Sequence, residues 1–132
     1  MKLLLDTHIW LWSVGEPKRL TPRVARELAS AKNQLWLSPV SVWELQLLLR
    51  KKRVDLNGMD IESWVRRSLE ILQLNEATFT IDVALELSKL NLPHGDPGDH
   101  FLVASARAFG LTLVTADERL INSTDISVLP NR

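Results

Sequence analysis

Four acidic side chains in this chain stand inside or beside apolar runs of the sequence: Asp6, Glu44, Asp99 and Asp117. A carboxylate carried into a protein core needs a partner charge, hydrogen bonds or a metal ion. Because the four acids are spread over the whole chain, we expect folding to assemble them into one acidic pocket. Oxygen ligands of this kind are preferred by hard divalent cations, so the residue types indicate a candidate metal site.

Three of the four acids, taken singly, also have a structural explanation. Asp6 and Asp117 are candidate helix N-caps, because each directly precedes a segment able to begin a helix. Asp99 falls in the first turn of its expected helix, where the helix dipole favours an acid. Glu44 differs, because its neighbours one turn away on a helix include aliphatic residues. A glutamate on such a face would cost stability if it had no function.

Clustered carboxylates repel one another unless cations neutralise them. Bound Mg²⁺ or Mn²⁺ would activate a water and stabilise charge on a transferring phosphoryl group, which is the chemistry of nucleases and phosphatases. Thr7 and Thr115 are candidate hydroxyls for orienting the acids or waters, and an ordinary capping role is the alternative for both. The histidines, at positions 8, 94 and 100, lack the spacing of a zinc site.

Tryptophan is abundant for a chain of this length, with five residues. Trp36, Trp43 and Trp64 fit core positions of the expected elements. Trp10 and Trp12 alternate shortly after the first acid and are candidates for a partner surface. Core packing is the alternative for at least one of these two.

Length and composition narrow the class of protein. A chain of 132 residues with 45% hydrophobic residues predicts a single domain, residues 1–132. The net charge is zero, so bulk electrostatics give no indication of a nucleic-acid-binding protein. The absence of Cys excludes disulfides and fits a cytoplasmic location. The apolar run after Lys2 is too short for a signal peptide or a membrane span, so no membrane association is expected.

Apolar runs and turn signals predict strands that alternate with helices. Expected strands cover residues 2–6, 35–38, 72–74, 111–115 and 126–129. Expected helices cover residues 22–31, 40–52, 61–72, 81–90, 99–109 and 118–121. This alternation predicts a parallel sheet covered on both faces. Ligands bind such a sheet outside the carboxyl ends of its strands, where Asp6 and Asp117 are placed.

Four motifs occur in order along the chain: Leu3-Leu4-Leu5-Asp6-Thr7-His8, Ser41-Val42-Trp43-Glu44-Leu45, His94-Gly95-Asp96-Pro97-Gly98-Asp99 and Val114-Thr115-Ala116-Asp117. Together they resemble the motifs of PIN-domain ribonucleases and, more narrowly, of the VapC toxins of bacterial toxin–antitoxin pairs. The resemblance implies a three-layer α/β/α sandwich with a central, mainly parallel sheet. It also implies Mg²⁺- or Mn²⁺-dependent endoribonuclease activity, with Asp6, Glu44, Asp99 and Asp117 as metal ligands and catalytic acids. Further implications are an RNA substrate, a homodimer and a small antitoxin protein as partner.

The third motif departs from the family pattern. Relatives of this kind carry Asp-Pro-Phe-Asp-Arg, where this chain has Asp96-Pro97-Gly98-Asp99-His100. Asp96 is an additional acid near the entrance of the expected site. Gly98 removes an aromatic surface on which a base could stack, and His100 stands where those relatives carry the permanent charge of an arginine. We therefore expect weaker RNA binding than in those relatives, with metal binding preserved.

Two other functions stay open on sequence grounds. A Mg²⁺-dependent phosphohydrolase would suit the sheet, but Asp6 is followed by Thr7 and His8 instead of the D-x-D pattern of aspartyl-phosphate enzymes. A catalytically degenerate PIN-like module that binds proteins is the second alternative. Metal-dependent cleavage of RNA by the purified protein separates the ribonuclease from this module.

Overall fold

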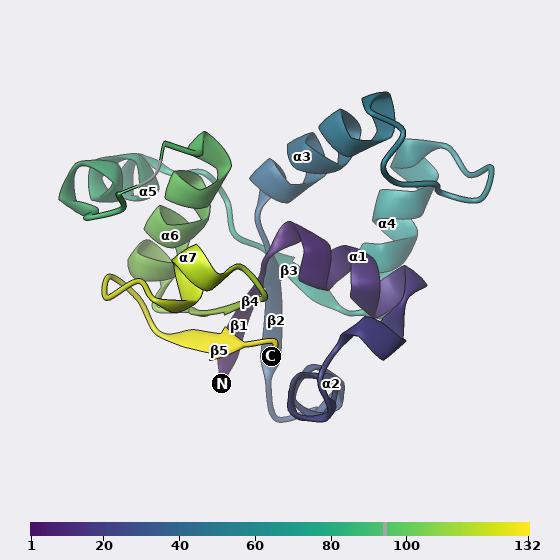
Figure 1. Cartoon of the computed structure of the whole chain (residues 1–132), viewed down its shortest axis with the longest axis horizontal. Helices are drawn as coiled ribbons and strands as arrows, with labels where there is room; N and C mark the ends of the chain where they lie inside the picture. Colours follow the sequence, from purple (N-terminus) through teal and green to yellow (C-terminus); the bar gives the residue numbers. More distant parts are fainter. Residues whose placement is uncertain (94) are drawn as a thin grey trace.

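The computed structural model describes residues 1–93 and 95–132, and within these residues the strands form a five-stranded sheet of order β3-β2-β1-β4-β5. All neighbouring strands run parallel. The strands are β1 (Lys2–Leu5), β2 (Gln34–Leu37), β3 (Leu74–Glu76), β4 (Thr112–Thr115) and β5 (Val128–Pro130). Figure 1 shows helices on both sides of this sheet. The parallel sheet expected from the sequence is confirmed.

The α-helices are α1 (Thr7–Gly15), α2 (Pro22–Ala29), α3 (Pro39–Arg50), α4 (Ile61–Ile71), α5 (Ile81–Glu86), α6 (Pro97–Phe109) and α7 (Glu118–Ile121). Short 3-10 helices follow α1 and α5: η1 (Pro17–Arg19) and η2 (Leu87–Lys89). Each of these α-helices begins at an Asp, Ser or Thr whose side chain accepts a backbone N–H. Local capping chemistry therefore sets where the helices start.

The side chains of β1 alternate between two apolar layers. Leu3 and Leu5 pack with residues of α1, α2, α3 and α4, whereas Leu4 packs with residues of α6 and α7. This alternation follows from the two-residue period of a strand. Figure 1 shows α1, α2 and α4 on one side of the sheet and α5, α6 and α7 on the other. The expected three-layer α/β/α sandwich is therefore confirmed.

The segment after Asp6 forms α1, which the sequence analysis did not assign as a helix. Trp10 of this helix is fully buried, and its indole N–H donates to Ser68 Oγ at 3.0 Å. Trp10 therefore belongs to the core, which corrects its assignment to a partner surface. Trp12 is partly buried, and the guanidinium of Arg19 lies 4.4 Å from its ring centroid.

Other expectations also need correction. Trp43 was expected in the core, but it is 50% exposed on α3. The strand expected at 72–74 begins two residues later, because Gln73 takes a left-handed backbone conformation with φ of 52° between α4 and β3. The last strand lies at Val128–Pro130 instead of 126–129, at the edge of the sheet, where the missing N–H of Pro130 is tolerated. None of the described helices has the length and apolar character needed to cross a membrane.

Candidate active site

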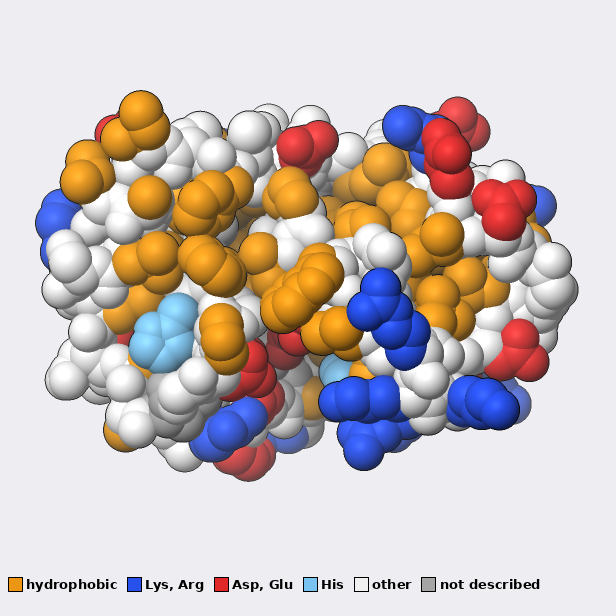
Figure 2. Space-filling model, turned by 90° about the horizontal axis from the view of Figure 1, so that it is seen from above, with side chains coloured by type: hydrophobic (Ala, Val, Ile, Leu, Met, Phe, Trp, Pro, Cys, Tyr) orange, Lys and Arg blue, Asp and Glu red, His pale blue; other side chains and the backbone are white. Residues whose placement is uncertain are grey.

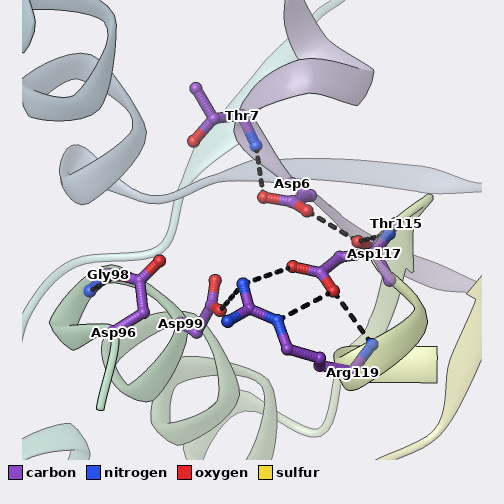
Figure 3. Close-up of polar contacts among 8 residues, drawn as sticks. All are labelled: Asp6, Thr7, Asp96, Gly98, Asp99, Thr115, Asp117 and Arg119. Atoms are coloured by element: carbon purple, nitrogen blue, oxygen red, sulfur yellow. Dashed lines mark hydrogen bonds and ion pairs between the residues drawn. The ribbon is translucent and has the colours of Figure 1, made fainter. Parts of the chain in front are cut away.

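The acids singled out in the sequence come together at one end of the sheet. Asp6 follows β1 and Asp117 lies two residues beyond β4, while Asp99 stands in the first turn of α6. Figure 3 shows these three carboxylates facing a common space. Glu44 approaches from the middle of α3. Parallel strands present their carboxyl ends to one edge, which is why residues 111 positions apart in the chain become neighbours.

Both carboxylate oxygens of Asp6 accept a hydrogen bond. The Thr115 hydroxyl donates to Asp6 Oδ2 at 2.6 Å, and the backbone N–H of Thr7 donates to Asp6 Oδ1 at 2.7 Å. The backbone N–H of Asp117 in turn donates to Thr115 Oγ1 at 3.1 Å. Burial raises the pKa of Asp6 above its ordinary value, although both bonds to its carboxylate act against the rise. The predicted orienting roles of Thr7 and Thr115 therefore have a geometric basis.

Glu44 is tied to α1 by the hydroxyl of Thr7. The Thr7 hydroxyl donates to Glu44 Oε1 at 2.9 Å and lies 2.9 Å from the buried Ser41 hydroxyl. Burial is the main reason that the pKa of Glu44 rises from 4.5 to about 7. Neighbouring carboxylates act in the same direction: Asp6, Asp96 and Asp99. Glu44 is therefore partly protonated near neutral pH.

The guanidinium of Arg119, a residue that the sequence analysis did not point to, contacts the carboxylates of two of the acids. Arg119 Nη2 lies 3.1 Å from Asp117 Oδ2 and 3.7 Å from Asp99 Oδ2. Asp99 is buried, with 6% of its surface exposed, whereas the Arg119 side chain is 56% exposed. The sequence feature that could have identified Arg119 as part of the site is its position, two residues after Asp117 in a short helix.

The third motif is built differently from what the sequence analysis expected. Asp96 is the N-cap of α6, and its Oδ1 accepts the Gly98 N–H at 3.0 Å. Gly98 is buried, and a Cβ there would lie 3.1 Å from both Cδ and Oε2 of Glu44. Position 98 therefore faces Glu44, so a larger side chain here would first meet the Glu44 carboxyl, and the loss of a stacking surface at Gly98 stays a prediction. His100 is partly buried on α6, and its contact with RNA stays a prediction.

The donor set suits a hard divalent cation, because every predicted ligand is a carboxylate. Among residues 1–93 and 95–132, no three acidic or histidine side chains are gathered closely enough to enclose an ion in this arrangement. The predicted third motif also includes His94, which lies outside the described residues. The residues that would hold Mg²⁺ or Mn²⁺ are Asp6, Glu44, Asp99 and Asp117. A bound ion would supply a water nucleophile and stabilise phosphoryl charge.

Comparison with known proteins shows the family of this chain and agrees with its fold. The profile of the PIN domain family matches residues 3–125, and the chain belongs to this family. The chain is similar to Ribonuclease VapC22 of Mycobacterium tuberculosis (strain ATCC 25618 / H37Rv), with 30% identity over 118 residues, 89% of this chain and 88% of that protein. The family resemblance expected from the four motifs is confirmed.

Solved structures with the same fold include toxin–antitoxin complexes. VapBC2 from Rickettsia felis, bound to a promoter DNA fragment, has a TM-score of 0.74 with 18% identity over 98% of both chains. DNA-bound VapBC from Salmonella typhimurium has a TM-score of 0.68 with 15% identity over 100% of this chain and 99% of that chain. FitAcB from Neisseria gonorrhoeae has a TM-score of 0.63 with 22% identity over 98% of this chain and 97% of that chain. At these identities the likeness shows the fold alone.

The raised pKa of Glu44 predicts how stability depends on pH. Because the folded chain binds this proton more tightly than the unfolded chain, the free energy of unfolding should fall as pH rises from 4.5 to about 7. Glu44→Gln should reduce this dependence of the free energy of unfolding on pH. It should leave the metal-free protein roughly 1 to 2 kcal/mol more stable than wild type at pH 8, less than the full pKa shift corresponds to, because solvent screens the partly exposed Glu44. Urea denaturation in EDTA from pH 5 to pH 8 measures both effects. Exposed Glu70→Gln is the control, and an unchanged slope in Glu44→Gln would contradict the prediction.

The contact between Gly98 and Glu44 predicts a second effect. Gly98→Ala places a methyl group about 3.1 Å from the Glu44 carboxyl, which must then shift. We expect Mn²⁺ affinity to fall about tenfold, because one ligand is misplaced. Shortening that ligand by Glu44→Asp in the same chain should recover part of the loss. Gly95→Ala, where nothing lies within 4 Å of an added Cβ, is the matched control. Calorimetry that finds equal Mn²⁺ affinity in Gly98→Ala and wild type would refute this role.

Proposed function

We propose that this chain is a Mg²⁺- or Mn²⁺-dependent endoribonuclease of the cytoplasm that acts as the toxin of a toxin–antitoxin pair. The observation that carries this proposal is the convergence of Asp6, Asp99 and Asp117 with Glu44 at the carboxyl end of the sheet in a PIN domain. The similarity to a protein named as a ribonuclease supports the activity. The substrate is RNA, and the reaction is hydrolysis of a phosphodiester bond.

The residues of the chain position the acids for this chemistry. Thr115 links Asp6 with the backbone of Asp117, and Thr7 links Asp6 with Glu44. These bonds orient the carboxylates of Asp6 and Glu44 before any ligand arrives. Glu44, with a pKa of about 7, gains or loses a proton near neutral pH and is suited to proton transfer. A divalent cation, when bound, supplies the Lewis acid and the activated water.

An apolar cleft supports an antitoxin as protein partner. The cleft has a volume of about 650 Å³ and lies between α3 and α4, with Val42, Val65 and Leu69 in its lining and Glu62 and Arg66 beside them. Figure 2 shows hydrophobic side chains gathered on the face of the molecule that carries these helices. An amphipathic helix can lay its apolar face into such a cleft. The structural neighbours from Rickettsia felis and Salmonella typhimurium, which are VapBC complexes of toxin–antitoxin systems, support the same partner class.

A different exposed surface supports the homodimer. Ile81 and Leu85 stand one turn apart on α5 and are 80% and 60% exposed. Phe79, just before α5, is 49% exposed and packs edge-to-face on Phe101 at 5.0 Å between ring centroids. Apolar surface of this kind is costly in water and marks an interface. We assign it to contact with a second copy of the chain.

The proposed activity predicts the behaviour of Asp99→Asn. The change removes one candidate ligand and one negative charge, so cleavage of RNA should fall by at least about a hundredfold and Mn²⁺ binding should weaken. Expression of the variant should be harmless in cells where the wild type is toxic. Asp55→Asn, at an exposed site in the segment between α3 and α4, is the matched control. A wild type that binds Mn²⁺ but cleaves no RNA would favour the degenerate binding module.

The proposed dimer predicts the effect of charge on α5. Ile81→Asp combined with Leu85→Asp should convert the dimer to a monomer, because each carboxylate would have to be buried in the interface. The fold should survive, since both side chains are already exposed in one copy of the chain. Ile71→Asp on α4, where 60% of the residue is exposed, is the matched control. Sedimentation of the wild type as a monomer would rule out this interface.

A further inference from the structure

The guanidinium of Arg119 contacts the carboxylates of two predicted metal ligands. Its Nη2 lies 3.1 Å from Asp117 Oδ2 and 3.7 Å from Asp99 Oδ2. Its Nε also lies 3.4 Å from Asp117 Oδ1, so two atoms of the guanidinium are in reach of the same carboxylate. Figure 3 shows the side chain reaching between the two acids.

The start of α7 holds Arg119 in this position. Asp117 is the N-cap of α7, and its Oδ1 accepts the backbone N–H of Arg119 at 2.9 Å. The cap therefore sets the Arg119 backbone directly beside the carboxylate that its own side chain contacts. The side chain is 56% exposed, whereas the Asp99 side chain is 8% exposed. The guanidinium can thus swing into solvent without disturbing the core, but Asp99 cannot.

The negative charges of the acids around the Arg119 guanidinium favour a cation at this position. Asp6, Asp96 and Asp99 act electrostatically on Glu44, and Asp117 acts on Asp6, so the acids form one repelling group. Such repulsion is relieved by positive charge at the carboxylates. Arg119 brings one positive charge to the same oxygens that a divalent ion would need. A guanidinium and a metal ion cannot both occupy this space, because they exclude and repel each other.

We propose that Arg119 is an internal competitor of the metal, which neutralises Asp99 and Asp117 in the metal-free protein and leaves them when a divalent cation binds. This inference rests on the proposed function, because it concerns the same acidic site. Two cations that compete for one pair of carboxylates are coupled, so the free energy that holds Arg119 in place is subtracted from that of metal binding. Arg119 thereby sets the metal concentration at which the site loads.

The test is titration of the metal-free protein with Mn²⁺ alone, with the affinity measured by calorimetry. Arg119→Gln should bind Mn²⁺ about tenfold more tightly than wild type, because the competitor is gone. Arg119→Lys, which keeps the charge, should stay closer to wild type. Arg132→Gln is the matched control, because Arg132 pairs with Glu118 of the same helix and its loss removes the same charge nearby. Its Mn²⁺ affinity should stay close to that of wild type.

Urea denaturation gives a second readout that does not depend on activity. In EDTA, Arg119→Gln should have a lower unfolding midpoint than wild type, since Asp99 and Asp117 then lack this counter-charge. Saturating Mn²⁺ should abolish the difference. If wild type binds Mn²⁺ and Arg119→Gln binds it equally or more weakly, the competitor role is overturned while the proposed function stands. If wild type binds no Mn²⁺, the proposed metal-dependent function fails and the inference fails with it.

Discussion

The pairing of β1 with β4 is the interaction on which the candidate site depends. The register places Leu5 beside Val114, and the Asp6 N–H donates to the Val114 carbonyl at 3.0 Å. The ladder thus ends with Asp6 next to Thr115, whose hydroxyl reaches the Asp6 carboxylate. A slip of one residue would turn Asp6 to the opposite face of the sheet. Such a slip would also place Lys2 or Asp6 where a buried leucine of β1 now packs, so core packing and site geometry depend on the same pairing.

The second constraint on the molecule is repulsion among its acids. Burial and like charges raise the pKa values of Asp6 and Glu44, so the metal-free pocket is under electrostatic stress. The chain limits this stress with the hydroxyls of Thr7 and Thr115 and with the guanidinium of Arg119. These groups also orient the carboxylates. The hydroxyls therefore hold the carboxylates ready for a cation, whereas the guanidinium of Arg119, on our proposal, competes with it.

Much of the fold followed from local patterns in the sequence. Pro and N-cap residues gave the starts of α2 and α3, and apolar runs gave β1, β2 and β4, because capping and strand burial depend on a few neighbouring residues. Local patterns were less informative for α1, whose apolar residues lie on several sides of the helix. Trp10 and Trp43 show the same limit: both are tryptophans in apolar helices, yet Trp10 is fully buried and Trp43 is half exposed.

The sequence by itself predicted which acids form the candidate site, because carboxylates beside or within apolar runs require a partner and their motifs carry the family resemblance. Only the tertiary structure decided how these acids are held. Gly98 meets Glu44 across 54 positions of the chain, and Arg119 reaches Asp99 across 20. No periodicity or spacing encodes such contacts, since they depend on how α3, α6 and α7 pack against the sheet. The chemistry of the donors is therefore a property of the sequence, whereas their charge balance and access to metal are properties of the fold.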